Sequence, residues 1–322
     1  MRRLVIDPDR TAADDAVRGL KFSPDGKLLG GVLGHGEATR AWRYDLDRDE
    51  PLPNPDDDDY TVERDAESPD PSWSDDLEVL AECLIDGSGH PGLRVTDLWS
   101  KPIETAWLMF GGALVATAYA FSPDGGDLYV AGSADDRRPV TRYSVEQLLI
   151  GHDPADADAD VVHDSADGNV AALALGPKSP WLACGYYGEA IDLIDPTGDR
   201  LTRRLQPRRA ASDAPATGLQ FSPRGDRLAA VCAGSLGVWA VESGERLVRT
   251  ALGTVAGVAF RPDGGLLAAT AGGAVIFYDT ACGEVRRLDF GVGPLSGVAV
   301  AADGLTAAVG AAGGRVVVFD LD

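Results

Sequence analysis

Apolar runs alternate with short polar turns along almost the whole chain. The run before a turn alternates small and apolar residues, and the run after it is continuously apolar, as in "VAGVAFRPDGGLLAAT" from Val255. A two-residue period is typical of β-strands, and Pro-Asp-Gly is typical of a tight turn between two strands. The pattern therefore predicts repeated strand–turn–strand units.

These units recur at a regular spacing. The sequence Phe-Ser-Pro-Asp-Gly begins at Phe22 and Phe121, and close variants begin at Phe221 and Phe260. Looser copies complete a set of seven anchors, spaced 51, 48, 54, 46, 39 and 40 residues apart: Phe22, Trp73, Phe121, Leu175, Phe221, Phe260 and Val300. Self-similarity at such a period indicates a repeat architecture.

Each unit contains two further predicted strands. The third usually ends at an aromatic or aliphatic residue followed by Asp, as in Tyr44-Asp45 and Tyr278-Asp279, and a Gly-containing turn and a fourth strand follow. Four strands with a period of about 40 to 50 residues are typical of a β-propeller blade. We therefore predict an all-β fold, a seven-bladed β-propeller with four antiparallel strands per blade, in which residues 1–322 form a single domain.

The two ends of the chain each carry one strand that lacks a neighbour in sequence. Arg3 to Ile6 is an isolated apolar run, and the seventh unit has only three strands before Asp322. A lone strand is unstable in water because its backbone and its apolar face need a partner. We expect residues 1–7 to pair with the third strand of the last unit and so complete blade 7 and close the ring.

The segment "VAGVAFRPDGGLLAATAGGAVIFYDTACGEVRRL" resembles a repeat of the WD-repeat family, and looser copies of it cover essentially the whole chain. The resemblance implies a propeller that serves as a scaffold for protein–protein interaction. The chain departs from the family pattern at the Gly-His pairs, because His35, His90 and His152 lie elsewhere in their units. Gly188, Gly272 and Gly313 also stand where the family has an Asp in the turn.

Composition and charge exclude several classes of protein. The net charge is −22, and it is concentrated in residues 1–170, which carry −21, whereas residues 171–322 carry −1. Such a surface repels phosphate groups, so we expect no nucleic-acid partner. No run of 18 or more apolar residues is present, and no apolar stretch follows the N-terminal arginines. We therefore expect no membrane segment and no Sec-type export. We predict a cytoplasmic monomer with an unidentified protein partner.

The cysteines and the carboxylate clusters do not predict a metal site. Cys83, Cys184, Cys232 and Cys282 form no C-x-x-C pair, so we interpret them as small residues of a core in a reducing compartment. Asp156, Asp158 and Asp160 are spaced like the start of a calcium loop, but Val161 and Asp167 stand where such a loop needs Gly and Glu. We expect neither a metal nor a cofactor.

The acidic run Asp56 to Asp59 lies in a long insertion after the third strand of the first unit. We interpret it as a solvated loop, and the alternative is a docking surface for a basic partner. A second long insertion lies between Glu146 and Asp160. Because strand direction alternates within a blade, both insertions fall on the rim that carries the first-to-second and third-to-fourth turns. We call this the first rim.

The opposite rim carries the second-to-third turns and the links between blades, and we call it the second rim. Exposed aromatic and arginine side chains supply much of the binding energy at protein interfaces. The predicted partner-binding residues on this rim are Phe110, Tyr186, Tyr187, Arg208, Arg209 and Phe290. The alternative is that Tyr186 and Phe290 pack between blades while the arginines only aid solubility.

Catalysis has little support in the sequence. The four histidines, which include His163, form no triad order and no metal-ligand spacing, and no phosphate-binding glycine loop precedes a helix. We therefore predict a non-catalytic scaffold. The alternative is a propeller enzyme or small-ligand binder that uses the mouth of the central channel, where small first-strand residues such as Ala118, Gly218 and Gly257 would have to be accompanied by convergent polar groups.

Overall fold

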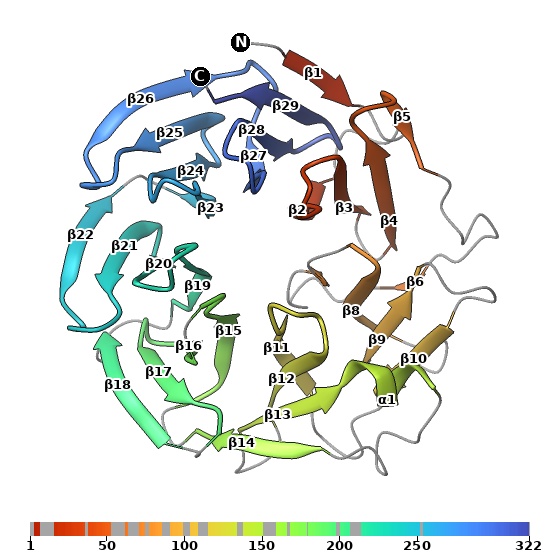
Figure 1. The fold of residues 1–322 in the computed structure, drawn as a ribbon, viewed down its shortest axis with the longest axis vertical. Coiled ribbons are helices and arrows are strands. Elements are labelled where there is room, and N and C mark those ends of the chain that lie inside the picture. The colour runs from red at the N-terminus through yellow and green to blue at the C-terminus, as the bar shows by residue number, and fades with distance from the viewer. Residues whose placement is uncertain are drawn as a thin grey trace.

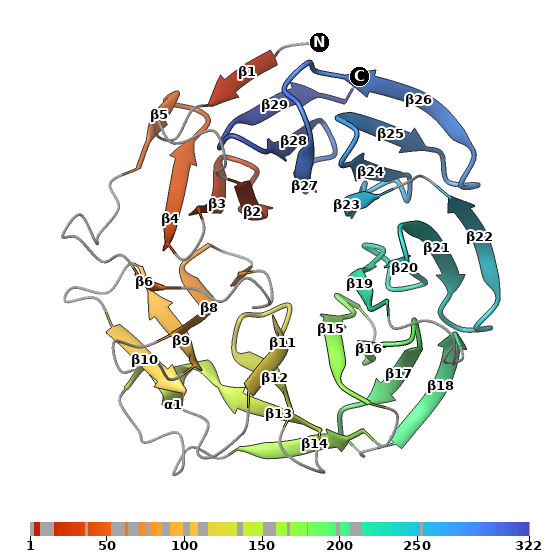
Figure 2. The ribbon, with the colours of Figure 1, turned by 180° about the vertical axis from the view of Figure 1, so that it is seen from behind.

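A computed structural model of the chain shows seven blades of four antiparallel strands each, arranged as a ring around a central axis (Figures 1 and 2). The structure describes residues 3–6, 16–35, 38–52, 62–63, 71–74, 77–85, 91–98, 104–108, 115–133, 138–150, 159–165, 168–178, 180–197, 200–206, 214–251 and 254–321. The predicted fold class is therefore confirmed. In the described part of the chain, no helix is long and apolar enough to cross a membrane.

Blades 3 to 6 are regular four-stranded meanders in which each strand pairs with its neighbours in sequence. Blade 3 consists of β11 (Val115–Phe121), β12 (Asp127–Ser133), β13 (Pro139–Ser144) and β14 (Asp160–Asp164). Blade 4 consists of β15 (Val170–Leu175), β16 (Leu182–Tyr186), β17 (Ile191–Asp195) and β18 (Arg200–Gln206). Blade 5 consists of β19 (Ala216–Phe221), β20 (Arg227–Cys232), β21 (Ser235–Ala240) and β22 (Arg246–Ala251). Blade 6 consists of β23 (Val255–Phe260), β24 (Leu266–Thr270), β25 (Ala274–Tyr278) and β26 (Glu284–Asp289).

Blade 7 is built from both ends of the chain, as predicted. Its inner strands are β27 (Leu295–Val300), β28 (Thr306–Ala311) and β29 (Val316–Asp320), and its outer strand is β1 (Arg3–Ile6). Leu4 lies opposite Val318 in an antiparallel register, and Ile6 is buried. The two ends of the ring are therefore joined by main-chain hydrogen bonds and by a shared apolar face (Figure 1).

Blades 1 and 2 are less regular and form one nine-stranded sheet. Blade 1 contains β2 (Ala16–Phe22), β3 (Leu28–His35), β4 (Ala38–Asp45) and the two-residue strands β5 (Glu50–Pro51) and β6 (Val62–Glu63). Blade 2 contains β7 (Ser72–Trp73), β8 (Val79–Ile85), β9 (Pro91–Asp97) and β10 (Glu104–Leu108). The two blades are linked because β6 pairs with both β4 and β8.

One short helix was not predicted. Helix α1 (Val145–Leu149) begins directly after the third strand of blade 3, and the Ser144 side chain caps it by accepting a hydrogen bond from the Gln147 amide. Val145 and Leu148 are buried against blades 2 and 3. The second long insertion therefore begins as an ordered helix, and the Ser-x-x-Gln spacing of a capping box was the sequence signal for it.

Each of the seven anchors is the last residue of the innermost strand of its blade, so the predicted repeat register is confirmed. The turn that follows is fixed by side chains. In blade 1 the Ser23 hydroxyl donates to Asp25 and accepts from the Leu28 amide. In blade 5, where Arg224 replaces this Asp, Ser222 donates to Asp226 instead. In blades 1, 3 and 5 the turn thus has a Ser–carboxylate pair, although the position of the Asp differs.

The apolar core is distributed among the seams, by which we mean the interfaces between neighbouring blades. The described residues form seven clusters of buried side chains, and each cluster joins two adjacent blades. Some approaches leave no space for a side chain: a Cβ atom at Gly185 in blade 4 would lie 2.4 Å from the carbonyl oxygen of Ala216 in blade 5. Because each cluster lies between two blades, every blade has both of its apolar faces covered only when the ring is complete.

Candidate functional site

The structure separates the predicted residues of the second rim. Tyr186 is 0% exposed and Phe290 is 7% exposed, so neither side chain is available to a partner. The Phe290 ring lies 4.7 Å from the Phe319 ring in the seam between blades 6 and 7. The Tyr186 hydroxyl lies 3.4 Å from Nε2 of His163. The expectation that these two aromatic residues form a binding surface was therefore wrong, because both fill the space between blades.

Tyr187 differs from its neighbour because its side chain is 46% exposed. Its turn is held by blades 4 and 5: the Tyr187 amide donates to Asn169, and the amides of Gly188 and Glu189 donate to the carbonyl of Ala214. The Gln206 side chain also donates to the carbonyl of Glu189 at 2.8 Å. An exposed aromatic side chain on a fixed turn loses little conformational freedom on binding.

The other predicted site residues lie outside the described residues. These are Phe110, Arg208 and Arg209 of the second rim and Asp56, Asp57, Asp58 and Asp59 of the acidic loop. Their roles stay predictions.

The polar side chains of the innermost strands connect neighbouring blades. Lys21 Nζ of blade 1 donates to the carbonyl of Trp73 in blade 2 at 2.9 Å. Gln220 of blade 5 accepts from the Phe260 amide of blade 6 at 2.8 Å. Ser296 of blade 7 donates to the carbonyl of Val17 in blade 1. These contacts tie the ring together near the axis.

Two ion pairs of the described residues, both within blades, have a buried carboxylate. Arg94 and Glu82 of blade 2 approach to 2.6 Å, and Arg204 donates two hydrogen bonds to Asp192 of blade 4, at 2.8 and 2.9 Å. The thiol of Cys184 lies near the second pair, and burial raises its pKa well above its usual range. No group of three His, Cys, Asp or Glu residues that could hold a metal ion occurs in the described part of the chain.

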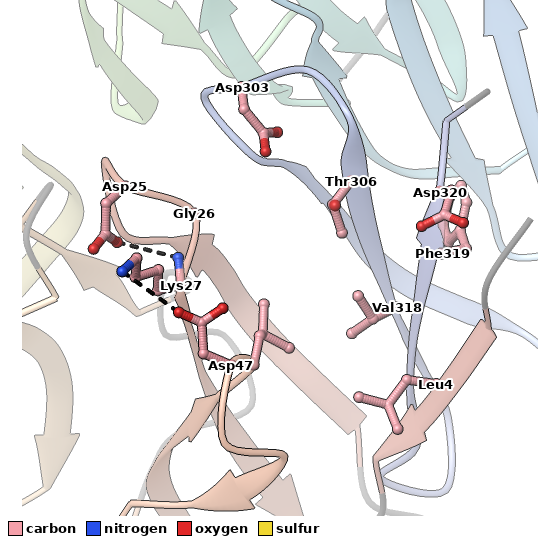
Figure 3. Close-up of a pocket in the computed structure, with 11 residues that line it drawn as sticks. Leu4, Asp25, Gly26, Lys27, Asp47, Asp303, Thr306, Val318, Phe319 and Asp320 are labelled. Atoms are coloured by element: carbon pink, nitrogen blue, oxygen red, sulfur yellow. Dashed lines mark hydrogen bonds and ion pairs between the residues drawn. The ribbon is translucent and has the colours of Figure 1, made fainter.

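A pocket of about 300 Å³ lies on the first rim, in the seam between blades 7 and 1 (Figure 3). We call it the seam pocket. Blade 1 contributes residues from two of its turns: Asp25, Gly26, Lys27, Leu46 and Asp47. Blade 7 contributes one residue from the N-terminal strand and five from the C-terminal part of the chain: Leu4, Asp303, Thr306, Val318, Phe319 and Asp320. Sequence reasoning missed this pocket because the turns of blade 1 that line it, at Asp25 and Asp47, are more than 250 residues from Asp303 and Thr306 of blade 7.

The walls of the seam pocket combine an apolar part with several carboxylates. Leu4, Leu46 and Val318 belong to the apolar cluster that joins blades 7 and 1. Figure 3 shows Leu4 beside Val318, whereas Asp303 lies on the opposite side of Thr306. The first turns of the two blades are in contact at Gly26, where a Cβ atom would lie at an ordinary van der Waals distance of 3.6 Å from Cβ of Ala301.

The charge of the seam pocket is strongly negative. The lining contains four aspartates and one lysine, Lys27, whose Nζ lies 3.5 Å from the Asp47 carboxylate. The formal charge of the lining is therefore −3. Hydrogen bonds from the Ser23 hydroxyl and the Lys27 amide lower the pKa of Asp25. Asp25 accordingly stays ionised at neutral pH.

No protein-family model matches this chain, and a search of curated proteins gives no significant match. The seven-bladed β-propeller is established by the arrangement of the blades themselves.

Proposed function

We propose that the protein is a non-catalytic interaction platform that binds a protein partner on the rims of its propeller. The resemblance of its repeats to those of the WD-repeat family supports this proposal, since that family implies scaffolding. On the basis of this resemblance we also propose that the chain is a member of the WD-repeat family. Fold alone does not fix function, so the proposal depends on what the rims present.

The observation that carries the proposal is Tyr187. It is a large exposed aromatic residue on a turn that backbone hydrogen bonds attach to Asn169, before the first strand of blade 4, and to Ala214, before the first strand of blade 5. Tyr is enriched among the residues that dominate the energy of protein interfaces, because it offers a large contact area and a hydroxyl with few rotatable bonds. A ring closed through β1 and β29 would hold such a side chain at a constant position.

The test compares partners that co-purify from the native cell with the wild type and with the triple variant Tyr187→Ala, Arg208→Ala, Arg209→Ala. We expect the triple variant to lose a protein partner while its melting temperature stays the same. The matched control is Val285→Ala, which removes an exposed apolar side chain (62% exposed) from the outer strand of blade 6. Equal partner recovery by all three proteins would exclude the second rim as the binding surface.

A further inference from the structure

Blades 4, 5 and 7 carry different side chains at one equivalent position beside a seam. In each blade the anchor residue pairs with a residue of the second strand, and the equivalent position is the residue immediately before that paired residue. It is Trp181 in blade 4, Arg227 in blade 5 and Thr306 in blade 7. The internal repeat therefore allows one seam to be compared with another in the same molecule.

In blade 5 the residue at this position reaches across to the next blade. Arg227 Nη1 donates a hydrogen bond to the carbonyl oxygen of Thr280, in the third-to-fourth turn of blade 6. The guanidinium also interacts with the thiol of Cys282 in the same turn. In blade 4 the side chain of Trp181 packs in the same cluster as Val241 of the corresponding turn of blade 5. Both seams are thus occupied by a large side chain of the preceding blade.

In blade 7 the equivalent side chain is a threonine, and the seam pocket lies there. Thr306 and Leu46, the counterparts of Arg227 and Thr280, both line the pocket. A volume of about 300 Å³ is at the lower end of the range of ligand pockets, roughly 300–1,000 Å³. The pocket therefore lies where the chain itself places an arginine side chain in another seam.

Blades 5 and 7 contribute charges of opposite sign at a second equivalent position, and the carboxylate of blade 7 favours an external cation. Blade 5 supplies Arg224 at the position where blade 7 supplies Asp303, and both residues are exposed. On the other side of the seam pocket, Asp47 is 65% exposed and is paired with Lys27 at 3.5 Å. The seam pocket thus has a threonine and a carboxylate at the positions where blade 5 has Arg227 and Arg224.

We propose that the seam pocket binds the side chain of an arginine residue from a partner protein. This inference rests on the proposed function and specifies the chemistry of a partner on the first rim. The aliphatic part of an arginine suits the apolar wall of Leu4, Leu46 and Val318, because long cationic side chains bury their stems on apolar surface. The guanidinium carries five N–H donors and suits carboxylates such as Asp47 and Asp303.

The binding experiment uses the full chain and a defined probe, N-acetyl-L-arginine amide, titrated by NMR chemical-shift changes. The ligand control is the same titration with N-acetyl-L-citrulline amide. This compound has a shape similar to that of the arginine probe but carries no charge. We expect saturable binding of the arginine probe at residues of the seam pocket and at least tenfold weaker binding of citrulline, about the contribution of one charged hydrogen bond. Binding should weaken as the ionic strength rises, because the pocket residues are partly exposed.

Two variants test the site, and a third is a matched control. Thr306→Arg introduces the residue that blade 5 carries at this position, so it should fill the pocket and abolish probe binding. The double variant Asp47→Asn, Asp303→Asn keeps the shape and should weaken binding by about tenfold or more. Glu242→Gln removes the carboxylate at the position of blade 5 that corresponds to Asp47, and it should leave binding unchanged.

Failure of this inference can be distinguished from failure of the proposed function. Absence of saturable probe binding by the wild type would overturn the arginine site, and so would binding that survives both Thr306→Arg and the double aspartate variant. Neither result bears on the second rim, which is tested through Tyr187. Loss of a partner on replacing Tyr187, without any probe binding, would leave the platform in place and remove the seam pocket from it.

Discussion

The seam between blades 7 and 1 and the seam between blades 5 and 6 share one backbone plan but differ in content. In both, the second strand of one blade faces the third-to-fourth turn of the next. Arg227 bridges the seam between blades 5 and 6, whereas the seam between blades 7 and 1 has a pocket lined by carboxylates and by the strand that closes the ring. The comparison shows that the repeat fixes the frame of both seams, while the side chain at one position differs: Arg227 crosses one seam, and Thr306 lines the pocket in the other.

The largest predicted effect concerns the closure of blade 7. Deleting residues 1–7 removes Ile6, which is 4% exposed, and leaves the edge of β29 without its partner. We expect the free energy of unfolding to fall by at least about 3 kcal/mol, since burial of one large aliphatic side chain alone is worth about 2–5 kcal/mol. Urea unfolding followed by circular dichroism measures the change.

Point variants of β1 separate the apolar contribution from the pairing of the strand. Ile6→Ala should cost about 2–4 kcal/mol. Val5→Ala, in the same strand but 47% exposed, should change stability by less than about 0.5 kcal/mol. Equal stability of the truncated and intact proteins would show that the ring does not depend on its N-terminal strand.

The next effect concerns the seam between blades 4 and 5, where Trp181 packs on the apolar cluster of both blades. Because this side chain is only partly buried, Trp181→Ala should cost about 2 kcal/mol, less than a fully buried aromatic residue. The melting temperature should fall accordingly. An unchanged melting temperature would show that the Trp181 side chain does not stabilise the packing of blade 4 on blade 5.

A smaller effect is expected from Arg227→Thr, which gives blade 5 the residue of blade 7. The variant loses a hydrogen bond on an exposed side of the molecule, so its free energy of unfolding should fall by about 1 kcal/mol or less. It should not gain affinity for the arginine probe, because Arg224 stands in blade 5 where blade 7 has Asp303. Gain of binding would show that space alone, without the carboxylates, defines the site.

The smallest effect concerns acid stability. Hydrogen bonds lower the pKa of Asp25 and of Asp124 below the ordinary value of 3.8, so each carboxylate contributes stability that is present above this pH. The contribution is lost as the pH falls below 3.8 through the lowered pKa of the folded state. Asp25→Asn should therefore reduce the dependence of the unfolding free energy on pH in this range. An identical dependence in variant and wild type would contradict the assigned hydrogen bond.

Much of the fold could be predicted from the sequence because the repeat is local. The seven anchors and the strand pairs around them follow from a two-residue period and from turn residues, and closure follows from the unpartnered strands Arg3–Ile6 and Val316–Asp320. The burial of Tyr186 and Phe290 could not be predicted in this way. Both residues stand at the ends of strands or in links, where the period no longer shows which side chain turns into a seam.

The seam pocket could not be predicted for a different reason. It depends on the juxtaposition of two turns of blade 1 with the first and last strands of the chain, and on a threonine at one register position. The sequence places Arg227 and Thr306 at the same position of the repeat. It does not show that the Arg227 side chain reaches across to blade 6.

The most direct test of the account is native-state hydrogen exchange of β1 and β29, with and without N-acetyl-L-arginine amide. The pocket is lined by residues of both strands, so a bound arginine side chain should stabilise the closure of the ring. We expect the probe to slow the exchange of the amides of β1 and β29 in the wild type but not in Thr306→Arg. Exchange that the probe leaves unchanged in the wild type, or slows equally in both proteins, would contradict the proposed arginine site.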